Sequence, residues 1–172
     1  MNMIQSAKDQ VLALTTAAYQ KAAAAGLLPE GVTVTPSVEI PKDTANGDYT
    51  TTFCLAAAKA MKMNPRQVAQ ILTEQMDLTD TYFTSVELAG PGFLNFRLGS
   101  RWFGDTVACV EAEGADYGRN DTLAGKKYMV EFVSANPTGP MHMGNARGGV
   151  LGDTLASVLQ KSGADAVSYT HL

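Results

Sequence analysis

Residues 134–153 read SANPTGPMHMGNARGGVLGD and combine two prolines, a histidine and closely spaced glycines. Glycine loses much conformational entropy when it is ordered, and proline cannot donate a backbone hydrogen bond. Ordinary core packing does not favour such a composition, whereas a loop whose backbone approaches a ligand closely requires it. The sequence therefore predicts a binding site in this stretch.

His142 and the glycines that follow it have the chemistry of a phosphate site. A helix N-terminus offers unpaired N–H groups and the positive end of a dipole, and both attract phosphate. Gly144, Gly148 and Gly149 would let a base or a phosphate lie against the backbone, and His142 can donate a hydrogen bond to it. The stretch is not a Walker loop, since no Gly-Lys-Ser/Thr follows, and its glycine spacing differs from the dinucleotide fingerprint.

Two regular elements must hold this stretch in place. Residues 127–134 are β-branched and aromatic, which predicts a buried strand, and residues 145–163 predict a helix. Residues 164–169 predict a further strand. Strand, glycine-rich loop, helix and strand is the opening of a parallel nucleotide-binding sheet. The helix has an apolar face made of Val150, Leu151, Leu155, Val158 and Leu159.

The preceding part of the chain predicts an α+β domain, because helices and strands follow one another in irregular order. Helical spacing covers residues 4–25, 51–63 and the stretch from Pro65, and strands are predicted over 81–88 and 93–98 around a tight connection. A helix over 100–114 is expected to turn Trp102, Phe103, Val107 and Val110 inward. The predicted division is an α+β domain over 1–115, a glycine-rich linker over 116–126, and the start of a Rossmann-like unit over 127–172.

Composition predicts a globular chain without a membrane partner. Of the 172 residues, 45% are hydrophobic and 17% charged, and no apolar run approaches the ~20 residues of a membrane span. A signal-peptide pattern is absent, so a cytoplasmic location is expected. Cys54 and Cys109 fit no metal spacing and are predicted to be buried thiols, and no metal site is expected. The net charge of −4 does not exclude a nucleic-acid partner, because binding depends on local positive patches and not on the sum over the chain.

The tetrapeptide His142-Met143-Gly144-Asn145 resembles the HIGH signature of class I aminoacyl-tRNA synthetases. The residues on both sides of it make the resemblance more specific, since residues 130–163 resemble the bacterial type of the arginyl-tRNA synthetase family almost throughout. Three strings nearer the start, NGDYTTTFCLAAAK, NPRQVA and GPGFLNFRL, resemble the amino-terminal domain of that family. The resemblance extends from about residue 1 to residue 167.

The resemblance implies an arginine–tRNA ligase that activates arginine with ATP, accompanied by Mg²⁺, and transfers it to tRNA-Arg. Catalysis in the family is in-line attack of the arginine carboxylate on the α-phosphate, with the protein positioning reactants and stabilising charge. By resemblance, His142 and Asn145 are the catalytic residues, and His142, Gly144 and Asn145 bind ATP. Asn145 stands where the signature more often has a second histidine.

The residues that match the family's arginine site are Glu131, Ser134 and Asn136, together with His142. A carboxylate can pair with an ammonium or guanidinium group, while a hydroxyl and an amide supply neutral hydrogen bonds. Taken alone, Glu131 could equally be a strand residue paired with Lys126 or Lys127, and His142 could be structural.

By the same resemblance, Phe93 and Asn95 match the positions that contact an exposed base in the D-loop of tRNA. An unpaired base can stack on an aromatic ring while an amide reads its edge. The alternative is that strand alternation buries Phe93 and leaves Asn95 as an ordinary polar strand residue.

The family continues for several hundred residues beyond the point matched by residue 167, so the sequence indicates an amino-terminal fragment. Its last residues depart from the family, and His171 is not expected to be a ligand. A chain with half of the ATP site should neither activate arginine nor charge tRNA by itself. Arginine-dependent exchange between pyrophosphate and ATP is the assay for this expectation.

Two other functions stay open from sequence alone. One is a different class I synthetase or nucleotidyltransferase, against which both Glu131 with its neighbours and the amino-terminal strings speak. The other is a stand-alone tRNA- or RNA-binding module in which the final strand–loop–helix is a remnant.

Overall fold

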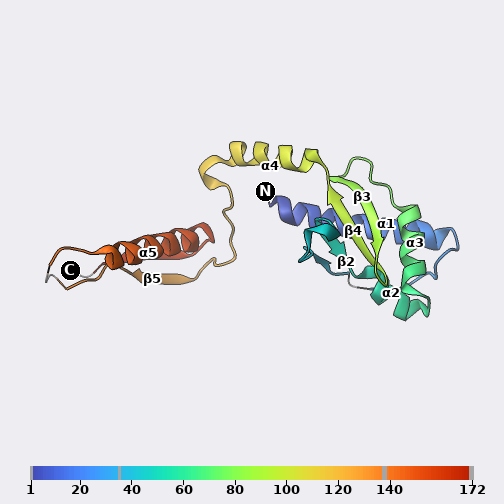
Figure 1. The fold of residues 1–172 in the computed structure, drawn as a ribbon, viewed down its shortest axis with the longest axis horizontal. Coiled ribbons are helices and arrows are strands. Elements are labelled where there is room, and N and C mark those ends of the chain that lie inside the picture. Colours follow the sequence, from blue (N-terminus) through green and yellow to red (C-terminus); the bar gives the residue numbers. More distant parts are fainter. Residues whose placement is uncertain (1, 35, 137–138, 171–172) are drawn as a thin grey trace. The chain divides into compact units, whose positions relative to one another are not determined.

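The computed structural model describes residues 2–34, 36–136 and 139–170, and the chain divides into two compact units, Asn2–Cys109 and Val110–Leu172 (Figure 1). None of the helices in these ranges is long and apolar enough to cross a membrane.

An antiparallel sheet with the strand order β1-β2-β4-β3 forms the centre of the first unit. Strands β3 and β4 pair along their length, with Ala89 opposite Phe93 beside the hairpin turn. The strands predicted over 81–88 and 93–98 are thus confirmed. The bounds are β1 Val38–Glu39, β2 Tyr49–Thr51, β3 Phe83–Ala89 and β4 Phe93–Leu98.

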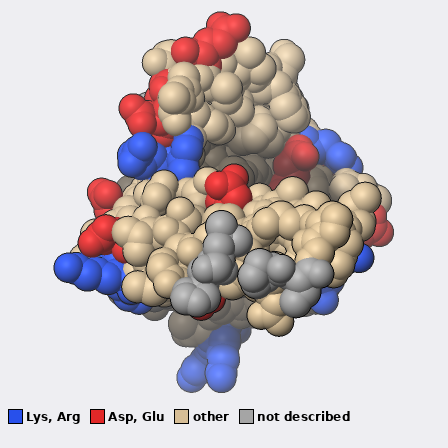
Figure 2. All heavy atoms as spheres, turned by 90° about the vertical axis from the view of Figure 1, so that its left-hand side faces the viewer, with Lys and Arg blue, Asp and Glu red and all other residues tan. Residues whose placement is uncertain are grey.

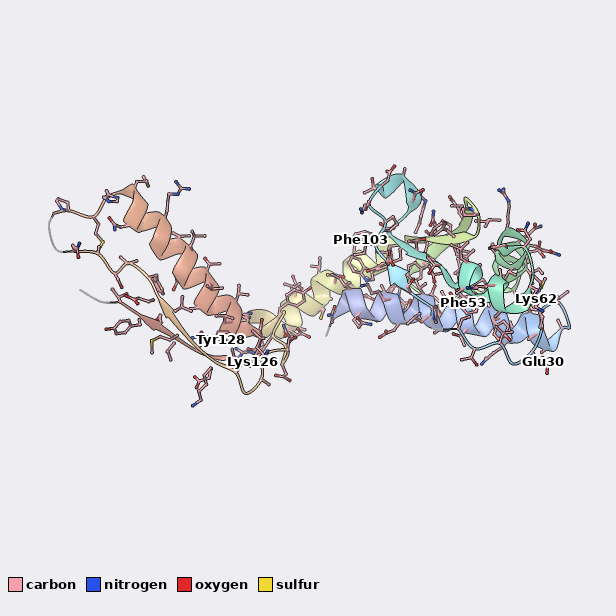
Figure 3. The ribbon with its side chains drawn as sticks, turned by 90° about the horizontal axis from the view of Figure 1, so that it is seen from below. Glu30, Phe53, Lys62, Phe103, Lys126 and Tyr128 are labelled. Atoms are coloured by element: carbon pink, nitrogen blue, oxygen red, sulfur yellow. The ribbon has the colours of Figure 1, made fainter. Side chains whose placement is uncertain are left out.

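Three helices pack against one face of this sheet, namely α1 (Met3–Ala24), α2 (Phe53–Met61) and α3 (Pro65–Gln75). Two of these helices begin directly after an asparagine that caps them. Asn2 caps α1 by accepting a hydrogen bond from the Gln5 N–H at 3.1 Å, and Asn64 caps α3, whose first residue is proline. The ring of Phe53 on α2 lies 6.1 Å from that of Tyr19 on α1 (Figure 3).

The side chains of strand β4 alternate between the core and the outer face of the sheet. Side chains alternate along a strand, so Leu94 and Phe96, both fully buried, face the helices. Phe93, Asn95 and Arg97 therefore belong to the opposite, outer face of the sheet. The sequence thus places a ring and an amide side by side on the face that the helices do not cover.

Cys54 lies in the core of the first unit with no exposed surface, as predicted, while Cys109 is half-buried and neither forms a disulfide. Burial raises the pKa of the Cys54 thiol from its ordinary value of 9.0 to about 12. Between these two pH values the unfolded chain has lost this proton and the folded chain keeps it. The contribution to stability is therefore constant below pH 9 and declines as the pH rises toward 12.

We expect the free energy of unfolding to fall by about 2 kcal/mol more in the wild type than in Cys54→Ala when the pH is raised from 8 to 10.5. Urea unfolding followed by the fluorescence of Trp102, the single tryptophan, measures this difference. An equal fall in the free energy of unfolding between pH 8 and pH 10.5 for the two proteins would contradict this prediction.

Helix α4 (Ser100–Glu113) follows β4 as predicted, but its apolar side is not buried. Phe103, Val107 and Val110 are 54%, 59% and 39% exposed, so the prediction that they turn inward is wrong (Figure 3). Trp102 does pack against the core and donates from Nε1 to the Met3 carbonyl at 3.2 Å. Helical spacing indicates which residues share a face, but it does not indicate that another element covers that face.

The second unit contains η2 (Gly114–Asp116) and a pair of parallel strands, β5 (Lys127–Glu131) and β6 (Asp165–Tyr169), joined by α5 (Met143–Lys161). The segment 116–126 is bonded to the end of α5. The Asn120 and Leu123 N–H groups donate to the Lys161 and Ser162 carbonyls at 2.9 and 2.8 Å, and Lys161 Nζ donates to the Tyr117 carbonyl at 2.9 Å.

Much of the apolar surface of the second unit is exposed. Met129 on β5 is 72% exposed and Tyr128 is 37% exposed, so the prediction of a buried strand is wrong (Figure 3). A two-stranded sheet with one helix has too few elements to cover both faces. The helix face is also exposed, at Val150, Leu151, Leu155 and Val158. Figure 2 shows that residues other than Lys, Arg, Asp and Glu make up most of this side of the molecule.

Candidate functional site

A cavity of about 300 Å³ opens on the outer face of the first sheet. Its size falls at the lower end of the range for small-ligand sites, and most of its lining is apolar. Strands β2, β3 and β4 supply its floor, and the turn between β3 and β4 supplies one wall. The lining residues are Pro41, Asn46, Thr50, Ala89, Gly90, Pro91, Phe93 and Asn95.

The two residues that the sequence predicts to contact a base, Phe93 and Asn95, both line this cavity. Phe93 is half-buried, which leaves part of its ring accessible. Asn95 is only 7% exposed, and it lines the cavity beside Phe93. An amide in the wall of a cavity can donate one hydrogen bond to a ligand and accept another from it.

Gly92 fixes the turn from which Phe93 emerges. It has φ +144°, and a Cβ at this position would lie 2.9 Å from Pro65 Cβ and 3.1 Å from the Pro65 carbonyl carbon. The turn therefore packs its backbone directly against the start of α3. This contact connects two strings that the sequence analysis singled out separately, GPGFLN and NPRQVA.

A second pair of contacts holds β2 beside β4, below the cavity. The Asp48 N–H donates to the Phe96 carbonyl, and Asp48 Oδ2 accepts from the Leu98 N–H, both at 2.8 Å. A Cβ on Gly47 would lie 2.8 Å from the Phe96 carbonyl oxygen. Gly47 and Asp48 thus hold the start of β2 against the backbone of β4.

The charges near the cavity are few and exposed. Arg97 Nη2 donates to the Ala45 carbonyl at 2.8 Å, and Arg97 Nε lies 3.8 Å from a Glu87 carboxylate oxygen. Both side chains are about half exposed, so this ion pair contributes little to stability. Recognition in the cavity therefore depends on shape, stacking and hydrogen bonds more than on charge.

In the second unit, His142 is the N-cap of α5. Its Nδ1 accepts a hydrogen bond from the Gly144 N–H at 3.1 Å, and Asn145 Oδ1 accepts one from the His142 N–H at 3.0 Å. This reciprocal pair is a capping box. Because Nδ1 is the acceptor, the imidazole proton resides on Nε2, which can donate outward. The capping box occupies the Gly144 N–H, so this group is not available to a phosphate while the box is formed.

The residues predicted to bind arginine lie at the carboxyl end of β5 and in the loop that follows. Glu131 is the last residue of β5, and it is exposed, as are Ser134 and Asn136. Among the described residues, no ion pair joins Glu131 to Lys126 or Lys127, and Lys127 Nζ lies 4.0 Å from Asp165. Pro137 and Thr138 lie outside the described residues.

Among the described residues, no three His, Cys, Asp or Glu side chains come together in a way that could hold a metal ion.

Residues 10–98, just over half of the chain, match the sequence model of the family described as "Arginyl tRNA synthetase N terminal domain". The chain belongs to this family. Arginine–tRNA ligase of Acetivibrio thermocellus is 47% identical over 164 residues, which cover 95% of this chain and 29% of that protein. Arginine–tRNA ligase of Caldanaerobacter subterraneus is 44% identical over 162 residues, with 94% and 29% coverage.

This member of the arginyl-tRNA synthetase N-terminal domain family thus spans about 29% of the length of these relatives. A crystal structure of arginyl-tRNA synthetase from Plasmodium falciparum has a similar fold, with a TM-score of 0.54 at 14% identity. The match covers 95% of this chain and 30% of that one. The family match includes the whole outer-face cavity.

Sequence reasoning missed the role of Gly152 in this family member. A Cβ at Gly152 would overlap the ring of Phe132, so glycine lets α5 pack closely on the residue that follows β5. Gly149 likewise faces Val133, although the sequence analysis considered it for ligand contact. Since α5 begins at Met143, its start lies roughly 13 Å beyond Phe132 along the helix axis.

Proposed function

We propose that the chain is the amino-terminal part of an arginine–tRNA ligase and that its first unit binds tRNA-Arg by holding one unpaired base in the outer-face cavity. The observation that carries this proposal is that the amide-bearing side chain of Asn95 and the half-buried ring of Phe93 line the same cavity. Family membership and the names of the relatives support the identity of the enzyme.

The chemistry of the cavity suits an extruded base better than a paired one. A base that leaves its stack offers two flat faces and a polar edge, which an aromatic ring and an amide can contact together. Base–aromatic stacking is worth about 1–3 kcal/mol per base. A chain with a net charge of −4 gains little from general attraction to phosphate, so such local contacts must supply most of the affinity.

For the second unit, we propose the start of the Rossmann-like catalytic domain. The parallel strands β5 and β6 with α5 between them support this assignment. In this proposal His142, Gly144 and Asn145 bind ATP, and Nε2 of His142 donates to a phosphate oxygen. Glu131, Ser134 and Asn136, with His142, hold arginine through its positive charge and its hydrogen-bonding groups.

Magnesium would accompany ATP in this proposal and would not occupy a protein cage. Mg²⁺ keeps several waters and is commonly held by substrate phosphates with few carboxylates, which agrees with the sparse acidic residues around α5. When bound, the ion would neutralise phosphate charge. A cytoplasmic location belongs to the same proposal, since the reaction requires ATP and free tRNA.

Asn95→Ala tests the tRNA proposal. We expect the variant to bind a D-arm hairpin of tRNA-Arg about ten-fold more weakly than the wild type, because the base loses its edge contacts. Fluorescence anisotropy with a labelled hairpin measures the affinity. Gln70→Ala is the matched control, since Gln70 is exposed on α3, which packs against the opposite face of the sheet.

Thermal unfolding should show that Asn95→Ala folds like the wild type. Equal affinities of the wild type and Asn95→Ala for the hairpin would overturn the proposal.

A further inference from the structure

The corner between α2 and α3 is positively charged in a chain that is acidic as a whole. The net charge is −4, yet between Asp48 and Glu74 the sequence has no carboxylate side chain and three cations, Lys59, Lys62 and Arg66. All three residues are exposed, and within the part of the chain that the structure describes none of them forms an ion pair. We call these three residues the basic corner.

The ends of the two helices gather these cations. Lys59 lies in the last turn of α2, Lys62 caps its C-terminus, and Arg66 lies in the first turn of α3. Only residues 62–64 connect the two helices, so the cations of both helix ends stay close to one another. Met61, between the two lysines, is buried in the core, which fixes the corner to the body of the first unit.

Two of the cations occupy positions that are unfavourable for them in the unliganded protein. Lys62 has φ +55°, a left-handed conformation for which a helix end normally uses glycine or asparagine. Arg66 lies near the positive end of the α3 dipole, in a first turn that has no acidic residue. An anion bound beside these residues would offset the repulsion at Arg66. The charges of the basic corner are thus better explained by an anionic partner than by stability.

The basic corner lies at the same end of the sheet as the turn between β3 and β4 (Figure 1). A Cβ on Gly92 in that turn would lie 2.9 Å from Pro65 Cβ, and Arg66 is the next residue of α3. The two residues before Gly92, Gly90 and Pro91, line the outer-face cavity. A chain-like ligand that leaves the cavity over this turn therefore meets the basic corner.

We propose that the basic corner binds the phosphate backbone of the RNA strand whose unpaired base enters the outer-face cavity. The inference rests on the proposed function of the first unit and adds to it a second surface, on the helices. Every base in RNA is flanked by phosphates, and lysine and arginine bind phosphates whatever the sequence. The cavity then specifies the base, and the basic corner supplies the part of the affinity that depends on salt.

The experiment measures binding of a tRNA-Arg D-arm hairpin at several salt concentrations, by fluorescence anisotropy. The variant Lys59→Gln/Lys62→Gln/Arg66→Gln removes the positive charge of the basic corner. We expect it to bind about ten- to a hundred-fold more weakly at 0.1 M salt, and the slope of log K against log salt concentration to fall by about 2. The same loss is expected for hairpins of different loop sequence, because phosphate contacts do not read bases.

The variant Lys8→Gln/Lys126→Gln/Lys127→Gln is the matched control. It changes the net charge by the same amount, but Lys8 lies on α1 and the two other lysines lie in the second unit. Its affinity and salt slope should stay close to those of the wild type. An equal loss in this control would show that overall charge, and not the basic corner, attracts the RNA, and would overturn the inference.

Two single variants separate binding from folding. Lys62→Gly suits the left-handed backbone, so it should unfold at a higher temperature than the wild type and yet bind the hairpin about five-fold more weakly. Lys62→Arg keeps the positive charge and should bind like the wild type. A Lys62→Gly protein with wild-type affinity would contradict a phosphate contact at this residue.

The remaining outcomes distinguish this inference from the proposed function. If the triple variant of the basic corner keeps the wild-type affinity and salt slope while Asn95→Ala weakens binding, only the inference fails. If Asn95→Ala also binds like the wild type, the proposed function itself fails. Displacement of the hairpin by a poly-glutamate peptide would point to an acidic protein as the partner of the basic corner and would overturn the inference.

Discussion

Replacing Phe93 with alanine should weaken binding of a tRNA D-arm hairpin by about ten- to a hundred-fold, which is the range for loss of one base–aromatic stack. The ring is half-buried at the edge of the cavity, so its accessible part is the natural platform for a flat ligand. Alanine would leave the base in contact with Asn95 but without a surface to stack on. Fluorescence anisotropy at fixed salt concentration measures the two dissociation constants.

Two variants control for this result. Phe103→Ala removes the same side chain from the exposed side of α4 and should leave the affinity unchanged. Phe93→Tyr keeps the aromatic face and should bind within a few-fold of the wild type. If Phe103→Ala weakened binding as much as Phe93→Ala, stacking in the cavity would not be the cause.

Gly92→Ala should lower the free energy of unfolding of the first unit by about 3 kcal/mol, because two penalties combine. The residue would have to adopt φ +144°, a backbone conformation that side chains rarely permit, and its Cβ would lie 2.9 Å from Pro65 Cβ. The backbone of Pro65 starts α3 and cannot move as a flexible side chain could. Urea unfolding followed by Trp102 fluorescence measures the loss.

Gly90→Ala, in the same turn, is the matched comparison. Gly90 has φ +52°, in the left-handed region, and a Cβ there would meet only Phe93 Cδ2 at 3.8 Å. We expect a loss of about 1 kcal/mol for this variant. Equal losses at the two glycines would show that the contact with Pro65 is not what requires glycine at position 92.

The sequence predicted the parts of the fold that depend on short-range patterns. The alternation in FLNFRL and the turn before it indicated β4, and the structure places Phe93 and Asn95 on its outer face. The helix predicted from Pro65 begins at that residue, with Asn64 as its cap. Such signals lie within a few residues of the element that they define, which is why they can be recognised in one sequence.

Other features depend on contacts between distant residues. The position of Thr50 opposite Asn95 follows from the register between β2 and β4, which no local pattern specifies. Gly152 is required by Phe132, twenty residues earlier. The exposure of Phe103 and of Met129 contradicts predictions from apolar spacing, because spacing identifies a face but not what covers it. One signal was available for Asn145, since a side-chain acceptor three residues after an N-cap is typical of a capping box.

The measurement that tests the central claim most directly changes the RNA and leaves the protein intact. Each unpaired nucleotide in the loop of a tRNA-Arg D-arm hairpin is replaced in turn by an abasic one, and the affinity of the wild-type chain is measured for each. We expect one position at which removing the base weakens binding about ten-fold, and at which Asn95→Ala causes no further loss. Equal affinity for every abasic hairpin would show that the cavity does not hold a base and would contradict the account.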